Sequence, residues 1–228
     1  MDGRAVAAGE WTGLILLLLV ASAALALLAM LRYPGGTQLD AHTVGYTLDQ
    51  NFLSDLGMTV AYDGRGNAFG SALFVLSMGA MVIGFGSGLW PVIRSYAARA
   101  GSRRAAQAAF VAALVVCAAF AGVALTPEDR VMEWHVRFTR LAFQLAPLVP
   151  LFMTVAAARA DSAARRLVAT WLLLAVVMIA YALLITFGPS TGTTDGLRTM
   201  VLAQKAVTIV AGALLLLVCA RSADQPPR

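Results

Sequence analysis

Six apolar stretches, each about 20 residues long, constrain the fold of this chain more than any other feature. They cover roughly 11–32, 69–93, 105–125, 137–158, 166–187 and 199–220. A helix of this length crosses the roughly 30 Å hydrocarbon core of a bilayer. The 228 residues are 60% hydrophobic and 13% charged, with a mean hydropathy of +0.77, which is far more apolar than a soluble core requires. The sequence predicts an all-α, polytopic bundle of six transmembrane helices, forming one integral membrane domain over residues 1–228.

The basic residues predict the orientation of the six spans. With both termini cytoplasmic, the inner segments hold ten Arg residues and four acidic residues, whereas the outer segments hold seven basic and eight acidic residues. Lys and Arg accumulate in cytoplasmic loops of membrane proteins. We therefore expect both termini to be cytoplasmic and the location to be a bacterial inner membrane.

Several functional classes find no support in the composition. The two cysteines, Cys117 and Cys219, lie in apolar stretches without CxxC spacing and are interpreted as small buried thiols. Two histidines, His42 and His135, cannot supply a three-histidine zinc site, and we expect no metal and no cofactor. The Arg clusters are not interleaved with aromatic residues, so membrane lipids rather than nucleic acid are the expected partners. Another membrane protein, or a second copy of the chain, remains a possible partner.

The first outer loop, 34–67, is the longest segment outside the spans. Leu48, Phe52 and Leu56 recur four residues apart, which predicts one apolar stripe on a short interfacial helix. Gly57 suits the position that ends such a helix. Asp55 would then lie near the helix C-terminus, where a carboxylate is unfavourable without a cationic partner.

The second and third outer loops supply those cations. Pro127, followed by two acidic residues, predicts the start of a helix leading into the fourth span. The candidate ligand-binding residues lie on the fourth and sixth spans: Arg137, Arg140, Gln144, Arg198 and Lys205.

Three interpretations of these outer polar residues stay open. In the first, the cations are anchors at the outer end of the bundle. In the second, Arg137, Arg140, Arg198 and Lys205 face Asp55 and His135 in a polar pocket for a phosphate or carboxylate headgroup. In the third, the pocket is catalytic: Asp55 orients His135 as a general base, with Ser54 or a water as the nucleophile.

Several short motifs resemble those of a known family. The segment 51–57 (NFLSDLG), Asn67 at the start of the second span, and 127–129 (PED) followed by His135 resemble the six-span prokaryotic membrane proteins of domain-of-unknown-function family 998. More remotely, the outer-loop Ser-Asp and the later Pro-Glu resemble the DRAM-like membrane proteins. The resemblance implies a six-helix integral membrane protein and supplies no catalytic residues.

These observations favour a non-enzymatic function. The leading hypothesis is an inner-membrane protein that binds or organises a lipid or another anionic amphiphile at an outer-leaflet polar pocket. One alternative is a membrane-embedded lipid hydrolase or transferase that uses Asp55 and His135. Another is a transporter or a subunit of a larger membrane assembly, although no acidic residue lies deep inside a predicted span.

Overall fold

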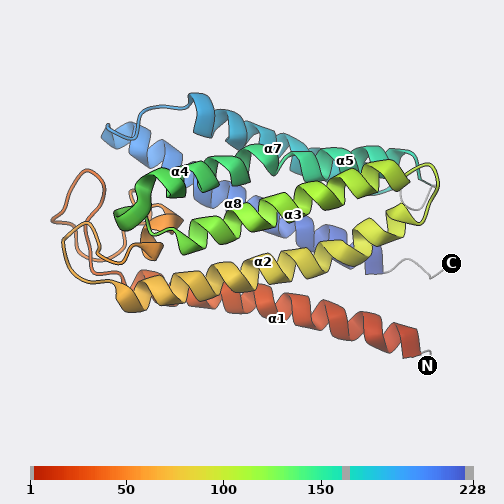
Figure 1. The fold of residues 1–228 in the computed structure, drawn as a ribbon, viewed down its shortest axis with the longest axis horizontal. Helices are drawn as coiled ribbons and strands as arrows, with labels where there is room; N and C mark the ends of the chain where they lie inside the picture. The colour runs from red at the N-terminus through yellow and green to blue at the C-terminus, as the bar shows by residue number, and fades with distance from the viewer. Residues whose placement is uncertain (1–2, 161–164, 224–228) are drawn as a thin grey trace.

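The protein is a bundle of helices of membrane-spanning length (Figure 1). The computed structural model describes the backbone of residues 3–160 and 165–223 and the side chains of 13–160 and 165–221. Within these residues, six helical segments are long and apolar enough to cross a membrane, which confirms the predicted number. The helices are α1 (Gly3–Arg32), α2 (Ala68–Ala97), α3 (Arg103–Leu125), α4 (Glu128–Leu145) with α5 (Leu148–Ala158), α7 (Val168–Phe187) and α8 (Thr194–Ala223).

Large apolar side chains cover the outside of the bundle. Leu17 and Leu31 of α1 are 63% and 80% exposed, and Ile209 of α8 is 72% exposed. In water such a surface would cost about 25 cal/mol for each Å² exposed, whereas lipid tails solvate it. The chain is a multi-pass membrane protein.

The fourth span is divided by a proline. α4 ends at Leu145 and α5 begins at Leu148, with Pro147 between them. Proline has no backbone N–H and its ring clashes with the preceding turn, so the helix cannot continue straight through it. α4 also begins at Glu128 directly after Pro127, as expected.

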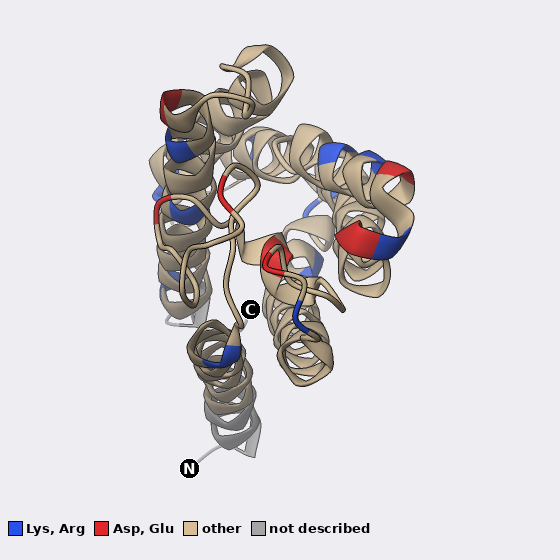
Figure 2. Cartoon of the chain, turned by 90° about the vertical axis from the view of Figure 1, so that its left-hand side faces the viewer, with Lys and Arg blue, Asp and Glu red and all other residues tan. Residues whose placement is uncertain are grey.

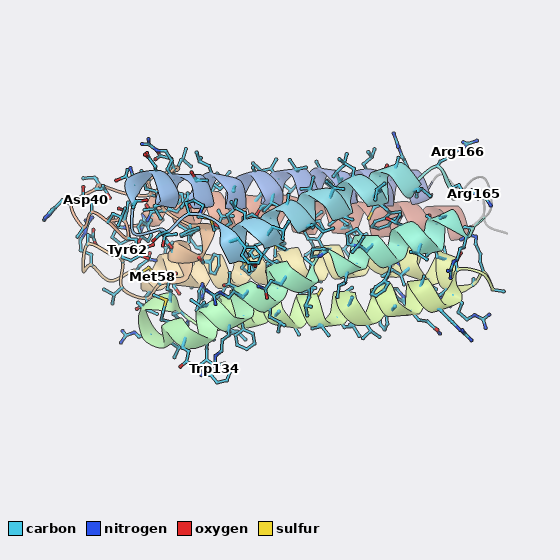
Figure 3. All side chains as sticks on the ribbon, turned by 90° about the horizontal axis from the view of Figure 1, so that it is seen from above. Asp40, Met58, Tyr62, Trp134, Arg165 and Arg166 are labelled. Carbon is cyan, nitrogen blue, oxygen red and sulfur yellow. The ribbon has the colours of Figure 1, made fainter. Side chains whose placement is uncertain are left out.

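The start of α1 and the end of α8 lie at one end of the bundle, and the long first loop lies at the other (Figure 1). Arg165 and Arg166 are at the first of these ends, whereas Asp40 and Tyr62 are at the second (Figure 3). We call the second the loop end. Here the residues 33–67 fold back over the helices, and acidic and basic residues both occur (Figure 2). That the loop end faces away from the cytoplasm stays a prediction.

The short helix in the first loop differs in form from the predicted one. It is a single 3-10 turn, η1 (Leu53–Gly57), and residues 48–50 form a turn before it. Leu48 is 64% exposed while Leu56 is fully buried, so the two do not share an apolar stripe. The chain is drawn inward here by hydrogen bonds to Asn51 and Asp55, and η1 packs against the bundle.

Gly57 has a different role from the predicted helix stop. It lies inside η1 and is not among the glycines with positive φ. A Cβ at Gly57 would lie 2.7 Å from the Phe74 ring of α2, so the absence of a side chain lets η1 approach α2 closely.

Candidate functional site

η1 is fastened to the helix bundle from several sides. The backbone N–H of Leu53 donates to Gln204 Oε1 of α8 at 2.8 Å. The carbonyls of Leu56 and Met58 accept from Asn67 Nδ2 at 3.1 and 2.9 Å, and Ser71 Oγ donates to Gly57 O at 2.8 Å. η1 therefore bridges α8 and the start of α2 across the loop end of the bundle.

Asn51 organises the chain that leads into η1. Its side chain is fully buried, and Nδ2 donates to Gly36 O and to Asp55 Oδ2, both at 3.0 Å. Its Oδ1 accepts from the backbone N–H of Thr47 at 2.9 Å. Its own carbonyl accepts from Lys205 Nζ at 2.5 Å and from the Tyr46 hydroxyl at 2.9 Å.

Asp55 is buried in this network, 1% exposed. Its Oδ2 accepts from Asn51 Nδ2 and from the backbone N–H of Phe52 at 2.9 Å, while Oδ1 has no partner among the described residues. Burial raises the pKa of Asp55 to about 8, and the Glu128 carboxyl adds to the rise. The hydrogen bonds from Asn51 and Phe52, and the charge of Lys205, oppose it. Burial therefore favours the neutral form of the Asp55 carboxyl.

His135 lies on α4 and is 4% exposed. Its Nδ1 is 2.7 Å from the carbonyl of Thr126, and because a carbonyl only accepts, Nδ1 carries a proton. Its Nε2 is 3.9 Å from Glu128 Oε2, and Glu128 in turn accepts from the Tyr62 hydroxyl at 3.3 Å.

The structure does not assemble the catalytic arrangement considered for Asp55, His135 and Ser54. In the part of the chain that is described, no hydrogen bond joins any two of these side chains. The ring of His135 turns to Thr126 and Glu128, whereas Asp55 turns to Asn51 and Phe52. Sequence spacing alone had grouped them because all three belong to the outer loops.

The predicted cations are likewise separated. Arg198 pairs with Asp49 at 2.7 Å, and Arg137 pairs with Glu133 at 2.5 Å on the same helix face. Arg137 also lies 5.0 Å from the Trp134 ring, which is on the outside of the bundle (Figure 3). The charge of Lys205 lies near enough to Asp55 to lower the pKa of that carboxyl.

Arg140 and Gln144 are the remaining candidate ligand-binding residues, and both lie on α4. Both are exposed, and Gln144 Nε2 donates to Thr186 Oγ1 of α7 at 3.1 Å. The expected convergence of four cations on one anion site is therefore not seen, because α4 directs its cations outward while α8 directs its own to the first loop.

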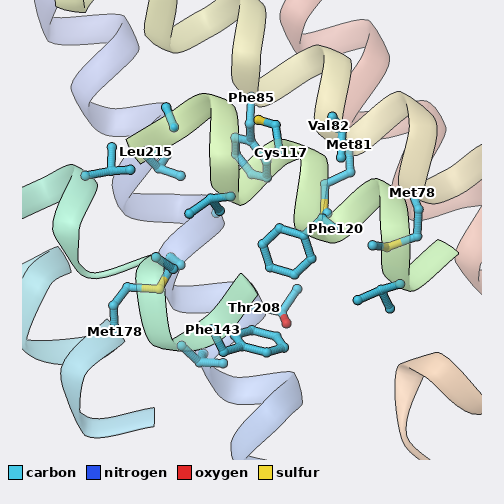
Figure 4. Close-up of a pocket in the computed structure, with 18 of the residues that line it drawn as sticks. Met78, Met81, Val82, Phe85, Cys117, Phe120, Phe143, Met178, Thr208 and Leu215 are labelled. Carbon is cyan, nitrogen blue, oxygen red and sulfur yellow. The ribbon is translucent and has the colours of Figure 1, made fainter. Parts of the chain in front are cut away.

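An apolar cavity of about 180 Å³ lies inside the bundle beneath η1. Aromatic and sulfur-containing side chains from α2, α3, α4 and α7 point into it (Figure 4), among them Met78, Phe85, Phe120, Phe143 and Met178. Along α2 the lining runs from Phe74 to Leu89, which is about 20 Å of helix at roughly 1.5 Å per residue. The cavity is therefore elongated along the direction in which the helices cross the membrane.

Polar groups gather at the end of the cavity nearest the loop. Ser54 of η1, Thr139 of α4, and Gln204 and Thr208 of α8 line it, and no charged residue belongs to its described lining. We call this the polar end of the cavity. Thr208 donates to the carbonyl of Gln204 at 2.7 Å.

Gln204 was not among the site residues predicted from sequence, although its neighbour Lys205 was. An amide within an apolar helix is costly and so marks a position worth examining. Sequence periodicity could have detected it, since Gln204, Val207, Ala211 and Leu215 share one face of α8 and all line the cavity.

No cluster of three or more His, Cys, Asp or Glu residues able to hold a metal ion occurs in the described parts of the chain. No protein-family model, curated protein or solved structure matches the chain. The resemblance to domain-of-unknown-function family 998 therefore stays a prediction.

Proposed function

We propose that this membrane protein binds an elongated apolar molecule, such as a lipid, with its tail in the cavity of the helix bundle and its polar end beneath η1. The observation that supports this most directly is the elongated apolar cavity with hydrogen-bonding groups at one end only. Its volume of about 180 Å³ exceeds the roughly 150 Å³ of an engineered apolar cavity that binds benzene in another protein.

The position of the cavity favours a ligand drawn from the membrane. The surrounding helices carry lipid-facing leucine and isoleucine side chains, so the tail of the ligand would move from the apolar interior of the bilayer into an apolar cavity. Binding then depends on packing within the cavity and on hydrogen bonds at the polar end, since transfer from lipid supplies little hydrophobic gain.

The hydrolase or transferase alternative has weaker support. Ser54 does line the polar end, but neither Asp55 nor His135 forms part of the cavity lining, and neither is hydrogen-bonded to Ser54. A binding function needs no such arrangement.

A photoreactive, uncharged alkyl probe would test the proposal. The purified protein is labelled in detergent, and the modified residues are identified by mass spectrometry. We expect adducts on lining residues such as Met81 and Met178. We also expect their loss in Val116→Phe, where the larger side chain fills the cavity.

The matched control is Val115→Phe, one residue earlier on α3, where the side chain is 39% exposed. It should label like the wild type. Val82→Phe on α2 provides a second cavity-filling variant. Adducts confined to lipid-facing residues, or unchanged lining adducts in both filled variants, would refute the proposal.

A further inference from the structure

The polar end of the cavity contains three hydrogen-bonding groups that have no partner among the described residues. They are the Gln204 amide nitrogen, the Ser54 hydroxyl and the Thr139 hydroxyl, and each belongs to a residue of the lining. Buried polar groups are nearly always hydrogen-bonded, yet the buried Thr139 hydroxyl has no partner among the described residues. The Gln204 NH₂ group and the half-buried Ser54 hydroxyl lie at the same end of the cavity, so the three groups together point to a ligand atom.

The orientation of Gln204 is determined by its contact with η1. Its oxygen accepts the Leu53 N–H at 2.8 Å, and an amide nitrogen could not take that place because it does not accept. The NH₂ group therefore occupies the other branch of the side chain and has no partner in the described residues. Gln204 is 6% exposed, so its two N–H donors are inside the protein.

Thr139 differs from several threonines in the other helices. Thr154, Thr186 and Thr208 each donate to the carbonyl four residues earlier, at 2.7 Å. This is the usual way for a threonine to satisfy its hydroxyl in an apolar helix. Thr139 makes no such bond, and its buried Oγ1 has no partner among the described residues.

The charge of the polar end restricts what can bind there. The nearby Lys205 ammonium is held by Asn51 O, and Arg198 is held by Asp49. An ionised phosphate or carboxylate at the polar end would therefore be buried without a countercharge. Two N–H donors and two hydroxyls favour instead an uncharged acceptor.

Resting on the binding function proposed above, we propose that the polar end binds an uncharged carbonyl group, as in an ester, amide or ketone, carried by an apolar tail. The carbonyl oxygen accepts from Gln204 Nε2, and the hydroxyls of Ser54 and Thr139 supply the remaining hydrogen bonds. The anionic headgroup expected from sequence is replaced by a neutral one in this proposal.

Competition among molecules of equal chain length tests the inference. Hexadecane, methyl palmitate, palmitamide and hexadecyl phosphate are each titrated against the photoreactive alkyl probe on the purified wild-type protein. We expect the ester and the amide to compete about tenfold better than hexadecane, as one additional buried hydrogen bond predicts, and the phosphate to gain no advantage.

Thr139→Val is the decisive variant because it keeps nearly the same shape while removing a hydroxyl that has no partner in the described parts of the chain. The preference for ester over hexadecane should fall several-fold while thermal stability is kept or raised. Thr154→Val, whose hydroxyl bonds only to its own helix, should leave the preference unchanged. Gln204→Glu, which keeps the acceptor for Leu53 but removes the NH₂ group, should also reduce the preference.

Equal competition by all the probes, or strongest competition by hexadecyl phosphate, would overturn the carbonyl assignment while the cavity still bound an alkyl tail. Failure of the alkyl probe to enter the cavity at all would overturn the binding function as well. Reduced stability of Thr139→Val with an unchanged ester preference would show that the hydroxyl is structural, and would also overturn the assignment.

Discussion

Asp55 belongs to a loop, yet its side chain is buried as completely as that of its neighbour Leu56. Two hydrogen bonds to Oδ2 hold it in place, and the Glu128 carboxyl lies near enough to raise its pKa. Burial thus favours the neutral form of this carboxyl in the loop. A neutral acid can keep both bonds without leaving an uncompensated charge in the protein interior.

The stability of the protein should depend on pH through Asp55. Its pKa is about 8 in the folded protein and near 4 when unfolded, so the folded state binds this proton more tightly. The stabilisation is complete below pH 4 and is lost progressively as the pH rises toward 8. Melting temperatures in detergent between pH 5 and 9 should therefore decline in the wild type.

Asp55→Asn should flatten this decline, because the amide oxygen can accept the same two hydrogen bonds and does not ionise. Asp49→Asn is the matched control, since Asp49 is half-exposed and pairs with Arg198 at the surface. An undiminished decline in Asp55→Asn would show that another group causes it.

Gly57→Ala should destabilise the protein by about 1–3 kcal/mol, because the added methyl group would overlap the Phe74 ring. Gly66→Ala in the same loop meets no atom within 4 Å and should be nearly neutral. Thermal unfolding of both variants measures the difference, and Gly57→Ala with Phe74→Leu should recover part of the loss. Equal melting temperatures for the two alanine variants would contradict the close approach.

At the scale of elements, the first loop is held by side chains from distant helices. Asp129 at the start of α4 accepts from Thr59 N at 2.8 Å, Thr59 Oγ1 at 2.6 Å and Val60 N at 3.1 Å. Gln204 of α8 holds η1 from the other side. These contacts explain how a 35-residue connection, 33–67, keeps a defined conformation with little secondary structure of its own.

Asp129→Ala should release the segment 59–66 and expose it to proteases. Arg65 is already exposed, so trypsin cleavage after Arg65 should be at least several-fold faster than in the wild type. Asp195→Ala, at the exposed start of α8, is the control and should cleave at the wild-type rate. Fragment masses identify the cut site, and an unchanged rate in Asp129→Ala would refute the anchoring role.

At the scale of the whole molecule, charge and packing divide the bundle into two ends. The Arg-rich loops lie opposite the folded loop, with the apolar surface between them (Figure 3). No charged residue belongs to the described lining of the cavity, so the ligand that we propose would be selected by shape and hydrogen bonding.

The orientation predicted from the distribution of basic residues can be tested with single cysteines. Each variant has a single cysteine, because Cys117 and Cys219 are first replaced. Val44→Cys lies at the loop end, where the Val44 side chain is 92% exposed, and Arg104→Cys lies at the opposite end. An impermeant maleimide added to spheroplasts should label the first, and should label the second only after lysis. The reverse pattern would place the loop end in the cytoplasm.

Much of the architecture was predictable from local patterns. The count of six spans, the proline break at Pro147 and the start of α4 after Pro127 each depend on residues close together in sequence. The ends were less accurate: α2 extends to Ala97, and α8 begins at Thr194, before the predicted span at 199. A count of apolar residues measures the membrane-crossing part, whereas a helix continues for as long as its backbone hydrogen bonds are satisfied.

The sequence by itself determined that this chain is a bundle of six apolar helices, because hydrophobic length and proline chemistry act locally. Only the tertiary structure decided which polar residues meet. Asn51, Asp55 and Lys205 come together, as do Leu53 and Gln204, across about 150 residues of chain. Helix rotation about its own axis sets these contacts, and it depends on the packing of all neighbouring helices at once. The cavity and its polar end arise from that packing.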